Sequence, residues 1–176
     1  MPEITVDFLL GPDLSSRLIA WFGQGKGGYS HAASVLSDGR YLDARSDILD
    51  GVPAGVHIRL PQSEKWIKRR RATLEVTEQE YADWEASLRA KITDGYGRAD
   101  ILAFLDPNEK HLDGHWICSA LALNAIQHVS RLHWTAPHLG FVPYPLAIAA
   151  HQITPNLCML ILQAAGFTLH QEEVAA

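Results

Sequence analysis

Short apolar runs separated by turn residues fill the first half of the chain, a pattern typical of β-strands. Residues 4–10 combine β-branched and aromatic side chains and end at a Gly-Pro pair, which predicts a buried strand. The same pattern predicts further strands over residues 30–36, 40–45, 56–60 and 72–76, and a last one over 167–171.

Apolar positions at helical spacing predict helices between these strands and throughout the second half. Asp13 is suited to cap a helix over residues 14–22, whose apolar face would hold Leu14, Leu18, Trp21 and Phe22. Thr77 and Glu80 form a capping-box pattern before a helix that ends near Lys91, with an apolar stripe of Tyr81, Trp84 and Leu88. Other helices are expected over residues 61–69, 98–105, 116–129, 145–151 and 154–165.

Length and composition predict one domain that spans residues 1–176. The 176 residues contain no internal repeat, low-complexity tract or linker-like stretch, and a chain of this size is typical of a single domain. It is long enough to bury a sizeable core without disulfides. Two cysteines, Cys118 and Cys158, are too few for a disulfide scaffold.

The charge balance argues against nucleic acid as a partner. There are 15 basic and 20 acidic side chains, for a net charge of −5, whereas binding to phosphates needs a basic face. One basic run, residues 68–71, is expected to be a solvated helix-to-strand junction that Glu75, Glu78 and Glu80 compensate.

The sequence shows no transmembrane segment or secretory signal. An acidic residue stands near the start, where a signal peptide needs positive charge. The apolar stretch over residues 157–162 is far shorter than a bilayer crossing requires. We therefore expect a cytoplasmic protein whose two thiols stay reduced.

A hairpin over residues 30–45 can bring a histidine and a carboxylate together. Its loop is Ser37-Asp38-Gly39, and a glycine at the third position of such a loop suits the left-handed residue of a three-residue turn. This register would place His31 and Asp43 on the same face of the hairpin; a two-residue turn would separate them. The pairs that it predicts are Leu36 with Arg40, Ala33 with Asp43, and His31 with Arg45.

Cys118 lies near the start of the helix expected over residues 116–129. At a helix N-terminus the backbone dipole stabilises a thiolate, and the free amide groups face an oxyanion that forms on an attacked carbonyl. A cysteine nucleophile also needs an imidazole as its base and a third group that orients the imidazole. His31 and Asp43 could fill these two roles. The alternative is that Cys118 is a small buried core residue.

These residues resemble the circularly permuted papain-like cysteine hydrolases of the NlpC type. The resemblance rests on Tyr29-Ser30-His31 in a strand, on Asp43 in YLDAR of the next strand, and on the late cysteine in WICSALALNAI. The tyrosine-led stretch 96–105 and Thr154-Pro155-Asn156-Leu157 are also similar. The order His, acid, Cys is the reverse of that in papain.

The resemblance implies an α+β fold in which an antiparallel sheet packs against the helix that carries the nucleophilic cysteine. It also implies a cysteine peptidase or amidase, without a cofactor, in which Cys118 attacks a peptide-like amide, His31 is base and acid, and Asp43 orients His31. Cell-wall peptides are one such substrate class. Two alternatives remain: a catalytically silent ligand-binding module, and a lipid acyl hydrolase or acyltransferase. The acyltransferase relatives tend to carry a second histidine where Asp43 stands.

Three further residues are candidates for substrate binding, and each could instead be structural. Tyr96 could line the groove or donate a hydrogen bond near the oxyanion, and Trp116 and Ser30 could contribute to its walls. Tyr96 and Trp116 could equally be core aromatics. Trp134 is a further possible wall residue.

Two rival ligand sites are weaker. His111, His115 and Cys118 have a spacing that could be imagined around zinc, but the intervening Leu-Asp-Gly disfavours the helix that would align the two imidazoles. Residues 23–28 form a glycine-rich loop, but no Ser or Thr follows its lysine and a strand follows the loop. The sequence therefore predicts neither a metal nor a nucleotide.

Overall fold

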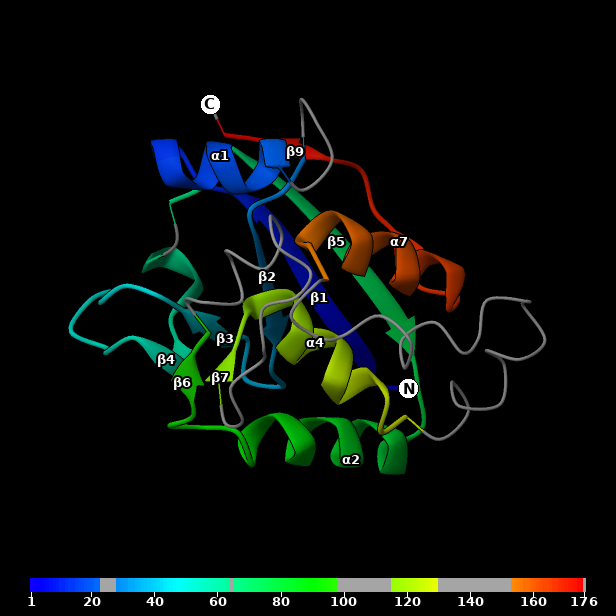
Figure 1. Ribbon diagram of the computed structural model, residues 1–176. Coiled ribbons are helices and arrows are strands. Elements are labelled where there is room, and N and C mark those ends of the chain that lie inside the picture. Colours follow the sequence, from blue (N-terminus) through cyan, green and yellow to red (C-terminus); the bar gives the residue numbers. More distant parts are fainter. Residues whose placement is uncertain (23–27, 64, 98–114, 130–152, 176) are drawn as a thin grey trace.

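The computed structural model describes residues 1–22, 28–63, 65–97, 115–129 and 153–175, and Figure 1 shows their arrangement. Its main element is an antiparallel sheet in the order β4-β3-β2-β1-β5-β8, with β9 also paired to β5. The strands are β1 Glu3–Leu10, β2 His31–Val35, β3 Tyr41–Arg45, β4 Gly55–Arg59, β5 Lys68–Glu75, β8 Thr168–Leu169 and β9 Glu173–Val174. The fold is therefore of the mixed α+β type.

Three helices lie on the same face of this sheet, with α4 between α2 and α7 (Figure 1). A fourth helix, α1, crosses one end of the sheet. A short parallel pair of strands, β6 and β7, lies beside β4. The bounds are α1 Leu14–Phe22, α2 Glu78–Arg89, α4 Cys118–Ile126, α7 Pro155–Ala164, β6 Gly95–Tyr96, β7 His115–Trp116 and a 3₁₀ turn η1 Pro61–Ser63.

The main core lies between the sheet and the helices. Alternate residues of β1, among them Ile4, Val6 and Phe8, belong to this core and are fully buried. The same core contains α4, a helix of small and aliphatic residues that packs on β2 and β3 and is buried along nearly its whole length. The period-two alternation of β1 places its intervening residues on the opposite face. This central packing holds the first residue of α4 against the sheet.

The opposite face of the sheet buries a charged group. Asp7 of β1 is fully buried, and its carboxylate accepts hydrogen bonds from the Tyr41 hydroxyl at 2.7 Å and from Arg71 Nε and Nη2, each at 2.8 Å. A buried carboxylate requires such partners because burial removes its hydration. Burial, followed by the charge of Asp7, raises the pKa of Tyr41 above its ordinary value.

The structure corrects the expectation for residues 61–71. The predicted helix over 61–69 is wrong, because η1 covers only 61–63 and β5 begins at Lys68. The basic run therefore lies within a strand rather than at a solvated junction. Its acidic partners are Asp7, Glu172 and Glu173, which lie far away in the sequence. Strand pairing places these carboxylates next to the basic residues of β5. The local spacing of charges in the sequence cannot show such a pairing.

The hairpin register is confirmed. Ser34 pairs with Leu42 and Val35 with Tyr41, and the Leu36 amide donates to the Arg40 carbonyl at 2.8 Å. Gly39 has a φ of 79°, in the left-handed region that a side chain rarely adopts. His31 and Asp43 therefore fall on the same face of the hairpin, opposite the face that meets α4.

Other predicted helices are present with shifted bounds. The helix expected over 116–129 begins at Cys118, because residues 115–116 form β7. Asp13 caps α1 as expected, since its carboxylate accepts from the Ser16 amide at 2.8 Å. Three of the residues expected on the apolar face of α1, Leu14, Leu18 and Trp21, are exposed rather than core. The expected helices over 98–105 and 145–151, and most of the loop 23–28, lie outside the described residues.

Within the part of the chain that the structure describes, no helix is long and apolar enough to span a membrane.

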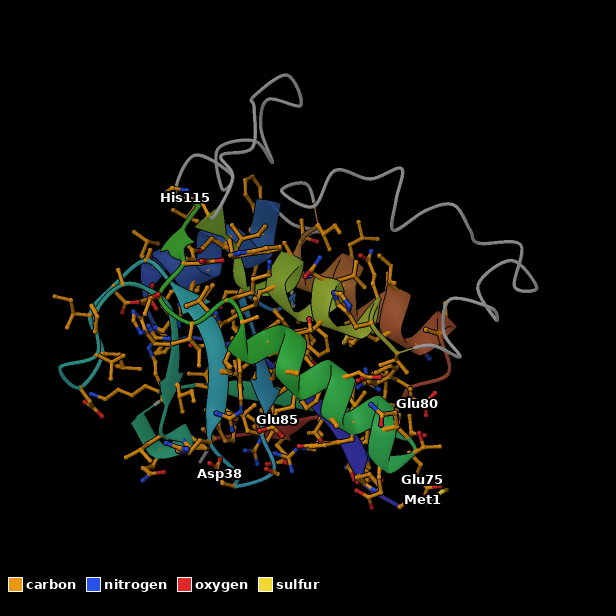
Figure 2. The ribbon with its side chains drawn as sticks, turned by 90° about the horizontal axis from the view of Figure 1, so that it is seen from below. Met1, Asp38, Glu75, Glu80, Glu85 and His115 are labelled. Carbon is orange, nitrogen blue, oxygen red and sulfur yellow. The ribbon has the colours of Figure 1, made fainter. Side chains whose placement is uncertain are left out.

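The capping box of α2 is formed as predicted. The Thr77 hydroxyl accepts from the Glu80 amide at 3.2 Å, and the Glu80 carboxylate accepts from the Thr77 amide at 2.9 Å. Figure 2 shows Glu80 in the first turn of α2 and Glu85 further along the helix. Trp84 and Leu88 are fully buried and Tyr81 partly so. This helix packs against α4 and supports it from one side.

Replacing Thr77 should weaken this support. We expect Thr77→Ala to lower the free energy of unfolding by about 1 kcal/mol, because first-turn amide groups lose their cap. Urea unfolding followed by circular dichroism measures the change. The exposed Gln79→Ala serves as the control, and equal stability of the Thr77→Ala and Gln79→Ala proteins would contradict the importance of the cap.

Candidate active site

The hairpin strands separate at the point where α4 approaches them. Pairing between β2 and β3 covers Val35–Tyr41 and Ser34–Leu42, and within these two described strands it goes no further toward His31. The helix α4 contacts both strands, and its N-terminal residue, Cys118, lies near His31 and Ala32 of β2. The backbone amide of Ala32 lies near the Cys118 sulfur and helps to lower the pKa of the thiol. Continued pairing in this register would have directed that amide toward Ala44.

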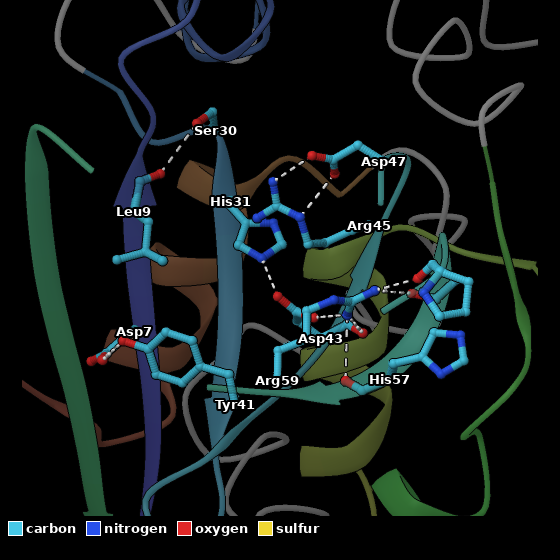
Figure 3. Close-up of polar contacts among 12 residues, drawn as sticks. Asp7, Leu9, Ser30, His31, Tyr41, Asp43, Arg45, Asp47, His57 and Arg59 are labelled. Atoms are coloured by element: carbon cyan, nitrogen blue, oxygen red, sulfur yellow. Dashed lines mark hydrogen bonds and ion pairs between the residues drawn. The ribbon is translucent and has the colours of Figure 1, made fainter. Parts of the chain in front are cut away.

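His31 and Asp43 meet on the two separating strands. His31 Nε2 lies 2.8 Å from Asp43 Oδ2 (Figure 3). The Asp43 side chain is fully buried, and 14% of the His31 side chain is exposed. Since Nε2 faces the carboxylate, Nδ1 is the nitrogen left to face another group. Asp43 therefore fixes both the orientation and the tautomer of the imidazole.

The third group at the site is the Cys118 thiol, which lies close enough to His31 for each group to shift the pKa of the other. Burial by itself would raise the pKa of Cys118, but the charge and hydrogen bond of His31 and the Ala32 amide hold it below its ordinary value. Burial would lower the pKa of His31, yet Cys118 and Asp43 together raise it well above its ordinary value. The two shifts have the same consequence: they favour a thiolate beside an imidazolium.

The electrostatics of Asp43 complete the arrangement. Burial alone would raise the pKa of this carboxyl, but the hydrogen bond and charge of His31, followed by the charges of Arg59 and Arg45, hold it below its usual range. Asp43 is therefore ionised when it accepts a hydrogen bond from His31. An ionised carboxylate stabilises the imidazolium that forms next to it.

Arg59 is a member of this cluster that the sequence interpretation missed. Its Nη1 forms an ion pair with Asp43 Oδ1, and its side chain is almost wholly buried. The alternation of side chains along β4 could have identified it. Asp43 pairs with His57, and Arg59, two residues further along, lies on the same face. A buried arginine in a strand next to a carboxylate is uncommon unless the two are paired.

A cavity of about 200 Å³ opens beside His31. Ser30 and Tyr96 line it, as do charged residues from three segments of the chain. The remaining charged and polar lining residues are Asp13, Ser16, Arg45, Ser46, Asp47 and Lys65. Cys118, which is 5% exposed, is not among the residues that line this cavity. A molecule in the cavity would therefore touch His31 directly.

The predicted substrate-binding residues differ in their positions. The Ser30 hydroxyl donates to the Leu9 carbonyl at 3.3 Å and accepts from the Gly11 amide at 3.2 Å, which holds it at the cavity wall. Burial, followed by the charge of Cys118, raises the pKa of Tyr96, so this phenol retains its proton near the sulfur.

Trp116 does not line the cavity. Its indole Nε1 donates to Asp94 Oδ2 at 2.8 Å, and the Lys91 ammonium lies 5.0 Å from the ring centroid. These contacts anchor β7 to the preceding turn, so the structure gives Trp116 a supporting position. Trp134 lies outside the described residues.

The second cysteine provides an internal contrast. Cys158 of α7 is also fully buried, and burial, followed by the charge of Cys118, raises the pKa of its thiol far above the ordinary value. No imidazole contributes to that shift. The two thiols are both free, yet their environments make opposite protonation states favourable.

The imagined zinc ligands are not assembled in the described chain. His111 lies outside the described residues, whereas His115 stands in β7. Among residues that the structure does describe, no group of three His, Cys, Asp or Glu side chains could hold a metal ion.

Comparison with known proteins gave no family assignment. The chain matches no protein-family model and no curated protein. The interpretation of the site therefore rests on its own geometry.

Cys118 should react selectively with a thiol reagent. We expect iodoacetamide to alkylate it rapidly at about pH 6, because the thiolate is already present there, while Cys158 stays unmodified. Peptide mass spectrometry of the native protein distinguishes the two sites. His31→Asn should move the rise in Cys118 labelling toward the ordinary thiol pKa of about 8.5.

The Cys158→Ala protein is the matched control and should label like the wild type. Labelling of Cys158 in preference to Cys118, or a Cys118 profile that His31→Asn leaves unchanged, would contradict the assigned ion pair.

Proposed function

We propose that this protein is a cysteine hydrolase of the permuted papain-like, NlpC-type fold that cleaves a peptide-like amide bond through an acyl-enzyme. One observation carries the proposal: the thiol of Cys118 meets His31, and His31 is held by the buried carboxylate of Asp43. A nucleophile, a base and an orienting acid in this order of contact are the groups that acyl transfer requires.

In the first half-reaction, the Cys118 thiolate bonds to the carbonyl carbon of the substrate, and the carbonyl oxygen takes the displaced electron pair. When the tetrahedral intermediate collapses, the carbon–nitrogen bond breaks and the leaving nitrogen takes the proton from His31 Nδ1. The products of this half are a thioester on Cys118 and a free amine.

In the second half-reaction, water attacks the thioester carbon while the now neutral His31 takes its proton. The carbon–sulfur bond then breaks, which releases a carboxylic acid and restores the thiolate beside the imidazolium. Asp43 stays ionised throughout and stabilises His31 each time it is protonated.

The start of α4 can stabilise the oxyanion. Its N-cap residue, Ile117, provides no side-chain cap for the first turn. The amide groups of Cys118 and its successors therefore point from the positive end of the helix dipole toward the sulfur's surroundings. Tyr96, which retains its proton near Cys118, is a second candidate donor.

The cavity beside His31 favours a polar substrate over a lipid ester. Acidic and basic groups both line it, notably Asp47, Arg45 and Lys65. Burying an acyl chain against such groups would remove part of their hydration without replacement. A peptide-like amide can instead satisfy them with its own polar atoms, so cell-wall peptides and related amides are the preferred class.

The experiment is a comparison of wild-type protein with Cys118→Ala on dipeptide amides, cell-wall muropeptides and lipid esters. We expect amide turnover by the wild type, and loss of turnover with the free energy of unfolding nearly unchanged in Cys118→Ala, because the sulfur is replaced by a small apolar group. Mass spectrometry should detect a thioester on the wild-type protein.

Asp43→Asn should lower kcat while it leaves Cys118 in place, and Cys158→Ala should retain full activity. Turnover by Cys118→Ala would eliminate the mechanism. Absence of turnover by the wild type on every substrate class, together with saturable binding of one of them, would favour a catalytically silent ligand-binding module instead.

A further inference from the structure

Arg59 is held rigidly beneath the proposed catalytic carboxylate. It is 3% exposed, and it extends from β4 toward β3 (Figure 3). Nη1 pairs with Asp43 Oδ1 and also donates to the Asp43 carbonyl at 3.2 Å. Nη2 donates to the carbonyls of Pro53 at 2.9 Å and Gly55 at 3.3 Å. Backbone acceptors on the far side of the guanidinium thus fix its plane.

The contacts of Arg59 also determine how Asp43 is oriented. Asp43 Oδ2 faces His31 and Oδ1 faces Arg59, so the two carboxylate oxygens have different partners. Rotation of the carboxylate would break both interactions at once. A continuous series of contacts therefore runs from the carbonyls of the 53–55 loop through Arg59, Asp43 and His31 to Cys118.

Arg59 balances the charge of the buried cluster. In the ion-paired state, Cys118 and Asp43 are anions and His31 is a cation, so these three residues carry one net negative charge. Cys118, Asp43 and Arg59 are all at most 5% exposed, and an uncompensated charge at such depth is costly. The guanidinium of Arg59 brings the sum to zero.

Other titratable and charged groups around the cluster do not replace it. Arg45 is paired with Asp47 at 2.9 Å, and 53% of the Asp47 side chain is exposed. Tyr96 and Cys158 face Cys118 as neutral groups, since burial raises the pKa of each. From β4, His57 offers its carbonyl to Arg59 at 3.4 Å, while its imidazole lies near Gly55, and His115 of β7 lies near Gly95.

We propose that Arg59 is a positioning residue which locks the Asp43 carboxylate toward His31 and supplies the positive charge that lets Cys118 and His31 exist as a buried ion pair. The inference rests on the proposed function of the site. It adds a fourth member to the cluster, one that acts through Asp43 and does not touch the substrate.

The test is the pH profile of Cys118 alkylation by iodoacetamide in the folded protein, which needs no substrate. We expect Arg59→Met to move the midpoint upward by about one pH unit or more, because protonation of the thiolate then restores neutrality. Arg59→Lys keeps the charge and should stay near the wild-type midpoint. Arg59→Met combined with Asp43→Asn removes one charge of each sign and should return the midpoint toward the wild-type value.

The matched control is Arg71→Met, which removes the arginine partner of the buried carboxylate of Asp7. It should cost stability without moving the Cys118 profile. If Arg59→Met does not fold, the comparison is made between Asp43→Asn and the double variant, where loss of the guanidinium should again raise the midpoint.

With the substrate in hand, Arg59→Met should lower kcat with little change in KM, and Arg59→Lys should recover part of kcat. An unchanged Cys118 midpoint in the folded Arg59→Met protein would overturn the inference and leave a structural role. That outcome differs from failure of the proposed function, which is a wild-type Cys118 that labels only at the pH of an ordinary thiol.

Discussion

The site depends on the contact of the His31 imidazole with two partners, a carboxylate and a thiol. On one side lies the buried carboxylate of Asp43, at 2.8 Å, and on the other the thiol of Cys118. A buried imidazole between them gains more from being charged than it loses by desolvation, which is why its pKa is raised. The thiolate is favoured because the imidazolium is present, and neither would be stable there alone.

This arrangement requires that β2 and β3 stop pairing before they reach His31. His31 and Asp43 lie on the face of the sheet opposite α4, so the first residue of α4 reaches His31 only where β2 and β3 have separated. The amide of Ala32, which does not pair with β3, then lies near the sulfur and helps to lower the pKa of the thiol. The core between the sheet and α4 holds this geometry, since Leu121 of α4 is buried in one cluster with Ala32 and Leu42 of the sheet.

The sequence predicted what local rules control. The position of Gly39 determined the turn and therefore the register that unites His31 with Asp43, and the capping box located α2. The strand expected over 72–76 is present within β5, but its basic first residues were assigned to a helix and a junction, because their partners come from Asp7 and from the far end of the chain. Arg59 was missed for a similar reason: its contact with Asp43 depends on the pairing of β4 with β3. Long-range strand pairing leaves little trace in local spacing.

The central claim, a thiolate–imidazolium pair formed by Cys118 and His31, is tested most directly by titration of the thiolate absorbance in the ultraviolet. The difference between wild-type and Cys118→Ala spectra isolates the one sulfur. The account predicts that this difference appears well below the ordinary thiol pKa of about 8.5 and persists as the pH rises. A difference that appears only at or above that pKa would contradict it.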